Sequence, residues 1–230
     1  MIQRDKAIVL LDDATEVESL AEGLSARISL DEFQALYTSF LIDLLSQLVN
    51  LSSTSIFLFT EYYLERNRWF KSLGSRAELR LLPTEEEVSL HIAESLFAEG
   101  YRRLLFLTCR NPIAPMQEIQ TTFHLLQLED DVIVVGPTED RDWYIAGIKS
   151  LHIPLLKELD LHSRDRYDQV LKAICNLDVL TFALQPRYDV VSAPDIERLR
   201  REIETRIIES QPYPQKTRDQ FFQLGKKLSP

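Results

Sequence analysis

Glycine is scarce in this sequence, which holds six glycines among 230 residues. Neither the G-x-G-x-x-G pattern nor the G-x-x-x-x-G-K-[ST] pattern occurs, so the glycine-rich loops that bring backbone amides close to a phosphate are absent. The H-E-x-x-H spacing of zinc hydrolases and the G-x-S-x-G turn of serine hydrolases are absent as well. The usual glycine-loop nucleotide sites and these two hydrolase classes are therefore excluded.

Cysteine is also rare, with Cys109 and Cys175 far apart and outside any C-x-x-C pair, which excludes a zinc ribbon or a thioredoxin-type site. We expect two buried free thiols in a reducing compartment. The first residues lack the long apolar run of a signal peptide, and no uncharged apolar stretch approaches about 18 residues. A cytoplasmic protein with no membrane segment is the expectation.

Basic residues are outnumbered, since 26 Lys and Arg face 36 Asp and Glu, which gives a net charge of −10 and a pI near 5.0. Surfaces that bind DNA, RNA or anionic membranes need clustered cations, so we expect neither nucleic acid nor membrane as a partner. A local basic pocket remains compatible with this balance.

Short apolar runs alternate with amphipathic stretches along most of the chain. Strands are predicted at 7–11, 55–60, 78–82, 103–108, 132–136, 143–148 and 179–184. Helices are predicted at 33–48, 62–73, 84–99, 116–128, 153–159 and 164–176, with a last one after Ser192. This alternation predicts an α/β fold with a mostly parallel sheet and helices on both faces.

Helix termini carry recognisable signals. Ser29 with Glu32 forms a capping box, and Thr84 with Glu87 forms a second one. Gly100 is well placed to end the helix that the second box begins. These signals set the expected bounds of two long helices.

One domain is expected over residues 1–210, followed by a C-terminal tail over 211–230 that begins with prolines. Phe221, Phe222 and Leu224 lie in that tail. We expect them to dock back onto the domain, and the alternative is contact with a partner subunit.

The loop after the first strand, Asp12–Gly23, has five carboxylates and no Lys or Arg, so it would repel a pyrophosphate. Asp12 and Asp13 suit a magnesium site or the nucleophile of an aspartate-dependent phosphatase. That phosphatase class needs its second aspartate where Ala14 stands. We therefore favour a solvated acidic loop.

Four segments together resemble one family. Val134–Ile148 resembles the stretch G-P-x-x-D-G-G-Y-Y-L-I-G-L, and Ala35–Asp43, Leu107–Pro115 and Tyr188–Ile196 follow the family's other motifs. The family is a bacterial group of GT-A-type glycosyltransferase-like proteins, of the arsenosugar-biosynthesis type and related to molybdopterin-guanylyl and phospholactate-guanylyl transferases. The resemblance implies a GT-A fold (nucleotide-diphospho-sugar transferase-like, Rossmann-like), an activated-sugar ligand and a bound Mg²⁺ or Mn²⁺.

The sequence departs from that family where its chemistry resides. Arg110 stands where the family has the aspartate that holds the metal, and a guanidinium cannot ligate a cation. Arg141 and Asp142 replace a glycine pair, and Val191 replaces one of two closing aspartates. Loss of the metal removes a charge worth several kcal/mol to transfer of a nucleotide or sugar, so we expect neither metal nor cofactor.

The residues at these matched positions are the candidate site. Candidate ligand-binding residues are Arg110, Asn111, Arg141, Asp142 and Tyr144, and candidate catalytic residues are Asp140 and Asp189. Arg110 and Arg141 together form an anion site in one interpretation. In the other, which we favour, Arg110 pairs with Asp140, Asp142 or Asp189 and closes the pocket.

Two functional hypotheses follow. In the first, the domain is catalytically degenerate and acts by binding a nucleotide-sugar or small anion, or as a subunit in a homodimer or with another protein. In the alternative, it is an active transferase with Arg110 in place of the metal and Asp140 or Asp189 as base. A third possibility is a structural protein that dimerises through its C-terminal aromatic residues.

Overall fold

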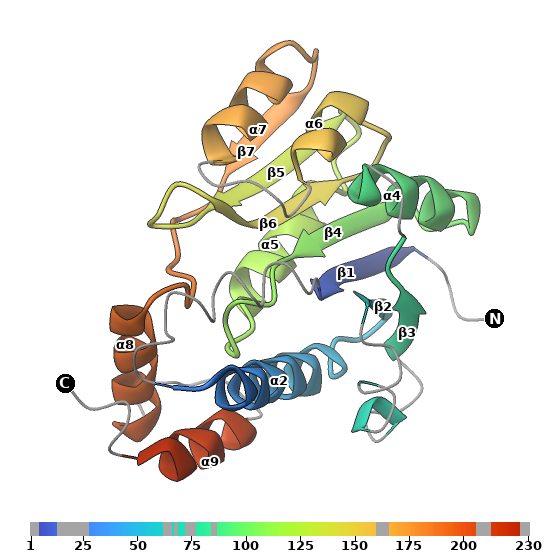
Figure 1. Ribbon diagram of the computed structural model, residues 1–230. Helices are drawn as coiled ribbons and strands as arrows, with labels where there is room; N and C mark the ends of the chain where they lie inside the picture. The colour runs from blue at the N-terminus through green and yellow to red at the C-terminus, as the bar shows by residue number, and fades with distance from the viewer. Residues whose placement is uncertain are drawn as a thin grey trace.

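The structure, a computed structural model, describes residues 5–12, 28–61, 66, 69–71, 77–83, 87–159, 166–205 and 213–225. Within these residues, seven strands form one sheet in the order β3-β2-β1-β4-β6-β5-β7 (Figure 1). The strands are β1 (Lys6–Asp12), β2 (Thr54–Thr60), β3 (Ala77–Leu81), β4 (Arg103–Leu107), β5 (Val132–Pro137), β6 (Trp143–Ile148) and β7 (Leu180–Ala183).

Strand β1 lies near the middle of the sheet, in parallel pairing with β2 on one side and β4 on the other. Residues Ala7–Leu11 are buried. Both faces of the strand meet apolar side chains, which explains a continuous apolar run in place of an alternating one. Strand order reverses between β1 and β4, and in open α/β sheets ligands bind beyond the carboxyl ends of the strands at such a point.

Strand β6 is the exception to the parallel arrangement, because it runs antiparallel to both β4 and β5. The register between β5 and β6 shifts at Gly136 and Pro137, where the β5–β6 connection begins. Since β6 runs backwards, its first residues lie at the edge where the parallel strands end. The connection 138–142 therefore reaches the same edge as the residues after β1 and β4.

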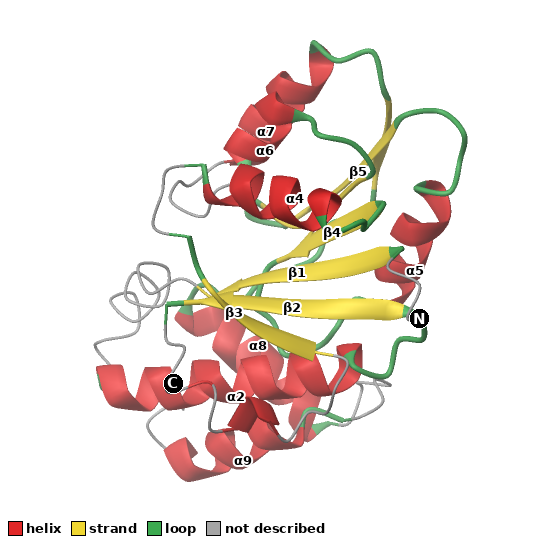
Figure 2. Ribbon diagram, turned by 90° about the vertical axis from the view of Figure 1, so that its right-hand side faces the viewer, coloured by secondary structure: helices red, strands yellow, loops and turns green. Residues whose placement is uncertain are grey.

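Helices cover both faces of the sheet (Figure 2), which confirms the expected α/β class. One core contains side chains from α2 (Leu30–Leu48), α5 (Met116–Leu125), α8 (Ala193–Glu204) and α9 (Gln215–Leu224). The core on the other face contains side chains from α4 (Val88–Ala98), α6 (Ile153–Glu158) and α7 (Arg166–Cys175). Burial of apolar area on two faces is the main stabilising contribution to such a domain.

Two of the predicted helix signals are confirmed and one is wrong. Ser29 and Glu32 form the capping box of α2. Gly100 follows α4 with φ +96°, and its amide donates to Phe97 in the last turn. Helix α4 begins at Val88, with Glu87 as a left-handed N-cap that makes no side-chain capping bond, whereas Thr84 lies outside the described residues.

Two further predictions reach residues beyond those described, and a third concerns the cysteines. The predicted helix 62–73 lies largely outside the described residues, although Phe70 is buried in the same core as the side chains of α2. Of the loop Asp12–Gly23, only Asp12 is described. Cys109 is buried as expected, but Cys175 is exposed at the end of α7, so the prediction of two buried thiols is wrong for the second.

The tail docks onto the domain through α9, as predicted. Helix α9 packs against α2, and Phe221 and Leu224 are buried, whereas Phe222 is 90% exposed, so the prediction of docking is wrong for that residue. The carboxylate of Asp43, on α2, accepts the backbone amides of Lys216 and Thr217 at 3.1 and 2.7 Å. These amides belong to the first turn of α9, so Asp43 acts as its cap from another helix.

Burial raises the pKa of the Asp43 carboxyl above its ordinary value, and the hydrogen bonds from Thr217 and Lys216 oppose that shift.

None of the described helices combines the length and the apolar character needed to cross a bilayer.

Candidate functional site

Polar side chains gather at the carboxyl edge of the sheet, close to the reversal in strand order. Asp12 ends β1, residues 108–111 follow β4, residues 138–142 connect β5 to β6, and residues 187–189 come after β7. Each segment leaves the sheet at the same edge, so residues distant in sequence meet there.

A buried cluster centred on Arg110 joins three of these segments. Nη1 of Arg110 lies 2.7 Å from Oδ2 of Asp142 and 3.9 Å from Oδ2 of Asp189. The three residues are 8%, 8% and 3% exposed. Thr108 Oγ1 donates to Asp189 at 3.3 Å. We call Arg110, Asp142, Asp189 and Thr108 the Arg110 cluster.

Backbone hydrogen bonds hold the cluster in place. The amide of Asp142 donates to Thr138 Oγ1, and the amide of Thr138 donates to the carbonyl of Asp142. Oδ1 of Asp142 accepts the amide of Trp143, and the carbonyl of Arg110 accepts the amide of Val190. Both partners of the ion pair are therefore fixed by the loops that carry them.

A divalent cation does not fit this arrangement. The resemblance implies a metal ligand at the position of Arg110, but a guanidinium is positive and offers no acceptor. A cation held by Asp142 and Asp189 would share both carboxylates with that fixed positive charge. Among the described residues, no three His, Cys, Asp or Glu side chains are arranged to hold a metal.

Asp140 and Arg141 lie outside the Arg110 cluster. Asp140 is exposed in the β5–β6 connection, so the carboxylates next to Arg110 are Asp142 and Asp189. Arg141 has a positive φ of 62°, is 69% exposed and pairs with Asp168 of α7. Arg110 and Arg141 therefore make separate ion pairs, and the anion site shared by the two guanidiniums stays a prediction.

Asn111 is buried and uses both ends of its amide within the protein. Nδ2 donates to the carbonyl of Tyr188 at 3.2 Å, and Oδ1 accepts the amide of Ile113 at 3.0 Å. The side chain thus ties the turn after β4 to the segment after β7. Its role toward a ligand remains a prediction.

Trp143 and Tyr144 are both buried, on opposite faces of β6. The sheet is covered on both sides, so the alternation along the strand sends each ring into a different core. Gly136 leaves room for the ring of Tyr144, because a Cβ there would lie 2.6 Å from Cε1 of that ring. The Tyr144 hydroxyl donates to the carbonyl of Gln185 at 3.2 Å, and burial raises its pKa.

Asp12 forms a buried ion pair that the sequence pattern did not reveal. It is 0% exposed, and its Oδ2 accepts from Thr60 Oγ1 and from Nε of Arg66, each at 2.7 Å. Arg66 also donates to Oδ1 of Asp12 at 3.3 Å and to Thr38 Oγ1 at 2.8 Å. The expectation of a solvated loop is therefore wrong for Asp12, whose charge is balanced by Arg66.

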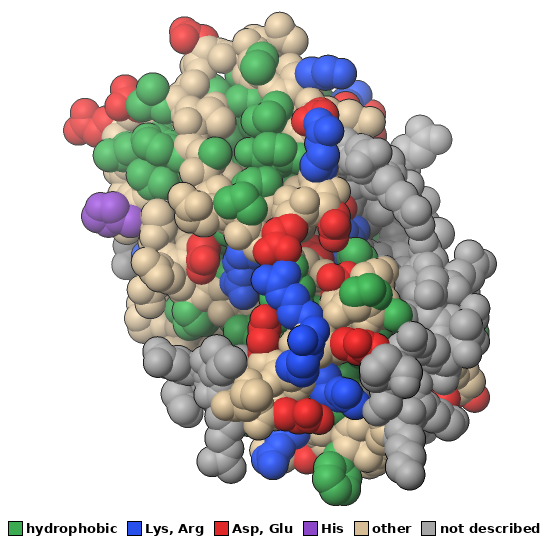
Figure 3. All heavy atoms as spheres, turned by 90° about the vertical axis from the view of Figure 1, so that its left-hand side faces the viewer, with side chains coloured by type: hydrophobic (Ala, Val, Ile, Leu, Met, Phe, Trp, Pro, Cys, Tyr) green, Lys and Arg blue, Asp and Glu red, His purple; other side chains and the backbone are tan. Residues whose placement is uncertain are grey.

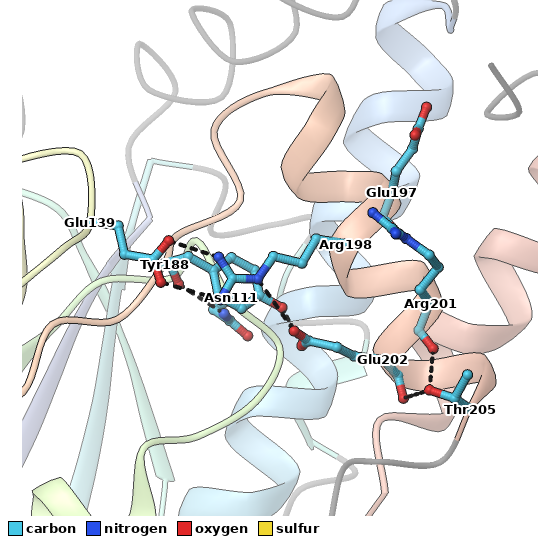
Figure 4. Close-up of polar contacts among 8 residues, drawn as sticks. All are labelled: Asn111, Glu139, Tyr188, Glu197, Arg198, Arg201, Glu202 and Thr205. Atoms are coloured by element: carbon cyan, nitrogen blue, oxygen red, sulfur yellow. Dashed lines mark hydrogen bonds and ion pairs between the residues drawn. The ribbon is translucent and has the colours of Figure 1, made fainter.

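Arg198 of α8 fastens the β5–β6 connection (Figure 4). Its guanidinium lies 3.8 Å from the ring centroid of Tyr188 and donates to both oxygens of Glu139, at 2.7 and 3.2 Å. Hydrogen bonding from Arg198 lowers the pKa of the exposed Glu139 carboxyl. Glu202 accepts the hydroxyl of Tyr188, so one helix holds both the connection and the segment after β7.

The face that carries α8 shows basic and acidic side chains interleaved (Figure 3). The ion pairs of α8 include Arg198 with Glu139 and Glu202, and Arg200 with Glu204. These cations are balanced by neighbouring acids, whereas a nucleic-acid surface needs clustered unpaired ones.

A small cavity of about 10 Å³ lies beside the Arg110 cluster. Its walls include Thr108, Asn111, Tyr144, Arg187 and Asp189. This volume holds about one water molecule. Arg187 is the residue here that sequence reasoning missed, although it stands two positions before the candidate Asp189 in the segment after the last strand.

Several solved structures share the overall fold of this chain. A candidate nucleotide-diphospho-sugar transferase of Desulfovibrio desulfuricans G20 superposes with a TM-score of 0.77 at 18% identity, over 97% of this chain and 96% of that one. The chain shares the nucleotide-diphospho-sugar transferase-like fold.

More distant structures have the same transferase-like fold. One is 4-diphosphocytidyl-2C-methyl-D-erythritol synthase of Anaerococcus prevotii DSM 20548, with a TM-score of 0.56 at 11% identity over 88% of this chain and 97% of that one. Another is CMP:2-keto-3-deoxy-manno-octonic acid synthetase in complex with CTP, with a TM-score of 0.50 at 10% identity over 89% of this chain and all of that one. No protein-family model matches the sequence, and no curated protein does either.

Proposed function

We propose that this protein is a catalytically degenerate member of the transferase-like fold, which binds a nucleotide-sugar or a related anion without a divalent cation. The observation that carries the proposal is the ion pair of Arg110 with Asp142, together with Asp189 at 3.9 Å. The sequence resemblance puts a metal ligand at this position, and here a guanidinium is held between two carboxylates.

Arg110 is poorly placed to replace the metal in catalysis. A clamp on a leaving diphosphate must direct its positive charge at the ligand. The Arg110 side chain is 10% exposed and faces the carboxylates of Asp142 and Asp189. Turning it toward a ligand would leave two buried carboxylates without their counter-ion, a costly arrangement. Binding is therefore better supported than transfer.

The solved structures support a nucleotide as the ligand class. The synthetase that shares this fold was determined as a complex with CTP. In this chain the strand order reverses between β1 and β4, and open α/β sheets bind their ligands beyond the carboxyl ends of the strands at such a point. The balanced charge of Asp12 also lowers the repulsion that an anion would meet at the end of β1.

Calorimetric and thermal-shift titration with UDP-, GDP- and CDP-sugars tests the proposal. We expect at least one of them to raise the melting temperature of the wild type equally with EDTA, Mg²⁺ or Mn²⁺. Silence across the panel would count against a nucleotide-sugar as the ligand. Magnesium-dependent stabilisation, or turnover of an activated sugar, would contradict the proposal.

A variant pair tests whether the guanidinium occupies the place of the cation. Arg110→Gln leaves Asp142 and Asp189 buried without a positive partner, so Mg²⁺ should raise its melting temperature. Wild type and the control Arg102→Gln, which changes an exposed residue before β4, should not respond to Mg²⁺. Equal responses of all three proteins would show that Arg110 does not stand in for a metal.

A further inference from the structure

Arg187 presents a guanidinium to the cavity beside the Arg110 cluster. The residue is half-buried and forms part of the cavity wall together with Asn111 and Tyr144. Its side chain makes one long hydrogen bond, from Nη2 to the carbonyl of Ile113 at 3.4 Å. The guanidinium carbon lies 5.8 Å from the centroid of the Tyr144 ring. These contacts satisfy little of its five-donor capacity.

Arg187 differs in its charge balance from the other arginines around this edge. Arg110 pairs with Asp142, Arg141 with Asp168, and Arg198 with Glu139. In the part of the chain that the structure describes, Arg187 has no carboxylate within 4.0 Å. Partial burial of an unbalanced charge is unfavourable unless a counter-ion is supplied.

The backbone of Arg187 is held rigidly. Its amide donates to the carbonyl of Pro137 at 3.1 Å, and its carbonyl accepts the amide of Glu139 at 2.8 Å. Arg198 packs on the ring of the adjacent Tyr188 and donates a hydrogen bond to Glu139, as Figure 4 shows. The main chain that carries the side chain is therefore fixed, so binding of a ligand need order only the torsions of the side chain itself.

We propose that Arg187 binds the oxyanion of a small ligand, a phosphate or carboxylate group, at the mouth of this cavity. A planar guanidinium matches either group with two parallel hydrogen bonds. Asp189 is the carboxylate in the cavity wall, and Arg110 and Thr108 already engage it. The inference rests on the proposed function for the place of the ligand and adds the residue that recognises its anionic group.

The test is titration of Arg187→Gln with inorganic phosphate, glucose 1-phosphate and malonate at constant ionic strength, followed by calorimetry. Arg102→Gln, which removes an exposed charge elsewhere, is the matched control. We expect at least one probe to bind wild type and Arg102→Gln alike, and to bind Arg187→Gln about tenfold more weakly, as loss of a charged hydrogen-bond pair predicts.

The three probes distinguish the sources of the group. Binding of inorganic phosphate supports a free anion, binding of glucose 1-phosphate alone supports a sugar phosphate, and binding of malonate alone supports a carboxylate. Equal affinity of wild type and Arg187→Gln for every probe, or no binding by wild type, would overturn the inference.

Failure of this inference and failure of the proposed function give different results. If nucleotide-sugars bind wild type and Arg187→Gln equally, the proposed function stands and the role of Arg187 is wrong. If a small oxyanion binds through Arg187 but no nucleotide-sugar binds, the role of Arg187 stands, and the anionic group that it binds does not come from a nucleotide-sugar.

Discussion

Single side chains determine the charge balance of the candidate site. Asp12 and Arg66 are separated by 54 positions, yet their side chains are 0% and 9% exposed and form one ion pair. Thr60 and Thr38 satisfy further hydrogen-bonding atoms of the pair. Because neither charge faces bulk water, each depends on the other, and the pair behaves as a unit.

Replacing Arg66 with Met is expected to lower the free energy of unfolding by about 3–5 kcal/mol, because it leaves Asp12 buried and uncompensated. Urea denaturation measures the change. The double variant with Asp12→Asn removes both charges, so it should recover much of the loss. A single variant that unfolds at the wild-type midpoint would show that the pair contributes little.

Among the elements, α9 depends on a contact that lies outside its own sequence. Its N-cap position is Pro214, which makes no side-chain capping bond. Asp43 of α2 accepts the amides of Lys216 and Thr217 instead. The same contact that satisfies the first turn of α9 therefore also attaches the helix to the domain.

Asp43→Ala should loosen α9, because two first-turn amides lose their acceptor; the expected cost is about 0.5–2 kcal/mol, the usual range for loss of a cap. Hydrogen exchange of residues 215–224 measures the effect. Asp43→Asn is the control, since its carbonyl oxygen keeps one acceptor and should preserve more protection. Unchanged exchange in Asp43→Ala would mean that apolar packing alone holds the helix.

For the whole molecule, the tail offers both a docked face and an exposed aromatic ring. Phe221 and Leu224 belong to the core below the sheet, whereas Phe222 is 90% exposed. Removing Gln211–Pro230 should therefore lower the free energy of unfolding by roughly 3 kcal/mol or more, by loss of buried apolar side chains. Phe222→Ser should change it by less than about 0.5 kcal/mol, as expected of a surface position.

Light scattering of the same two variants tests the homodimer alternative. If Phe222→Ser converts a dimer into a monomer while its unfolding midpoint stays constant, the ring contacts a partner. If both variants keep the oligomeric state of the wild type, Phe222 has no role in assembly.

Much of the fold could be predicted from the sequence, because apolar spacing reports burial directly. The capping box at Ser29 and Glu32 and the apolar run of β1 both correspond to elements in the structure. The direction of β6 could not be predicted. A buried strand of six residues has the same apolar pattern in either direction, so only its neighbours reveal that it is antiparallel.

Less of the candidate site than of the fold could be predicted from the sequence. The pairing of Arg110 with a nearby carboxylate is confirmed, since Asp142 lies close in a matched segment. The pairing of Asp12 with Arg66 could not be predicted, because no local pattern links them. Arg187 escaped notice for a different reason: what distinguishes it is the lack of a carboxylate partner among the described residues, which only three-dimensional contacts reveal.

The reversed strand β6 has a consequence for how this scaffold changes over evolution. Asp142 stands in a hairpin connection, and Arg110 stands in a turn just beyond β4, so neither contributes to the sheet itself. Hairpin tips accept substitutions and insertions more readily than buried strands do. A few replacements in these two loops can thus change the charges at the edge of the sheet, while the packed layers beneath keep their shape.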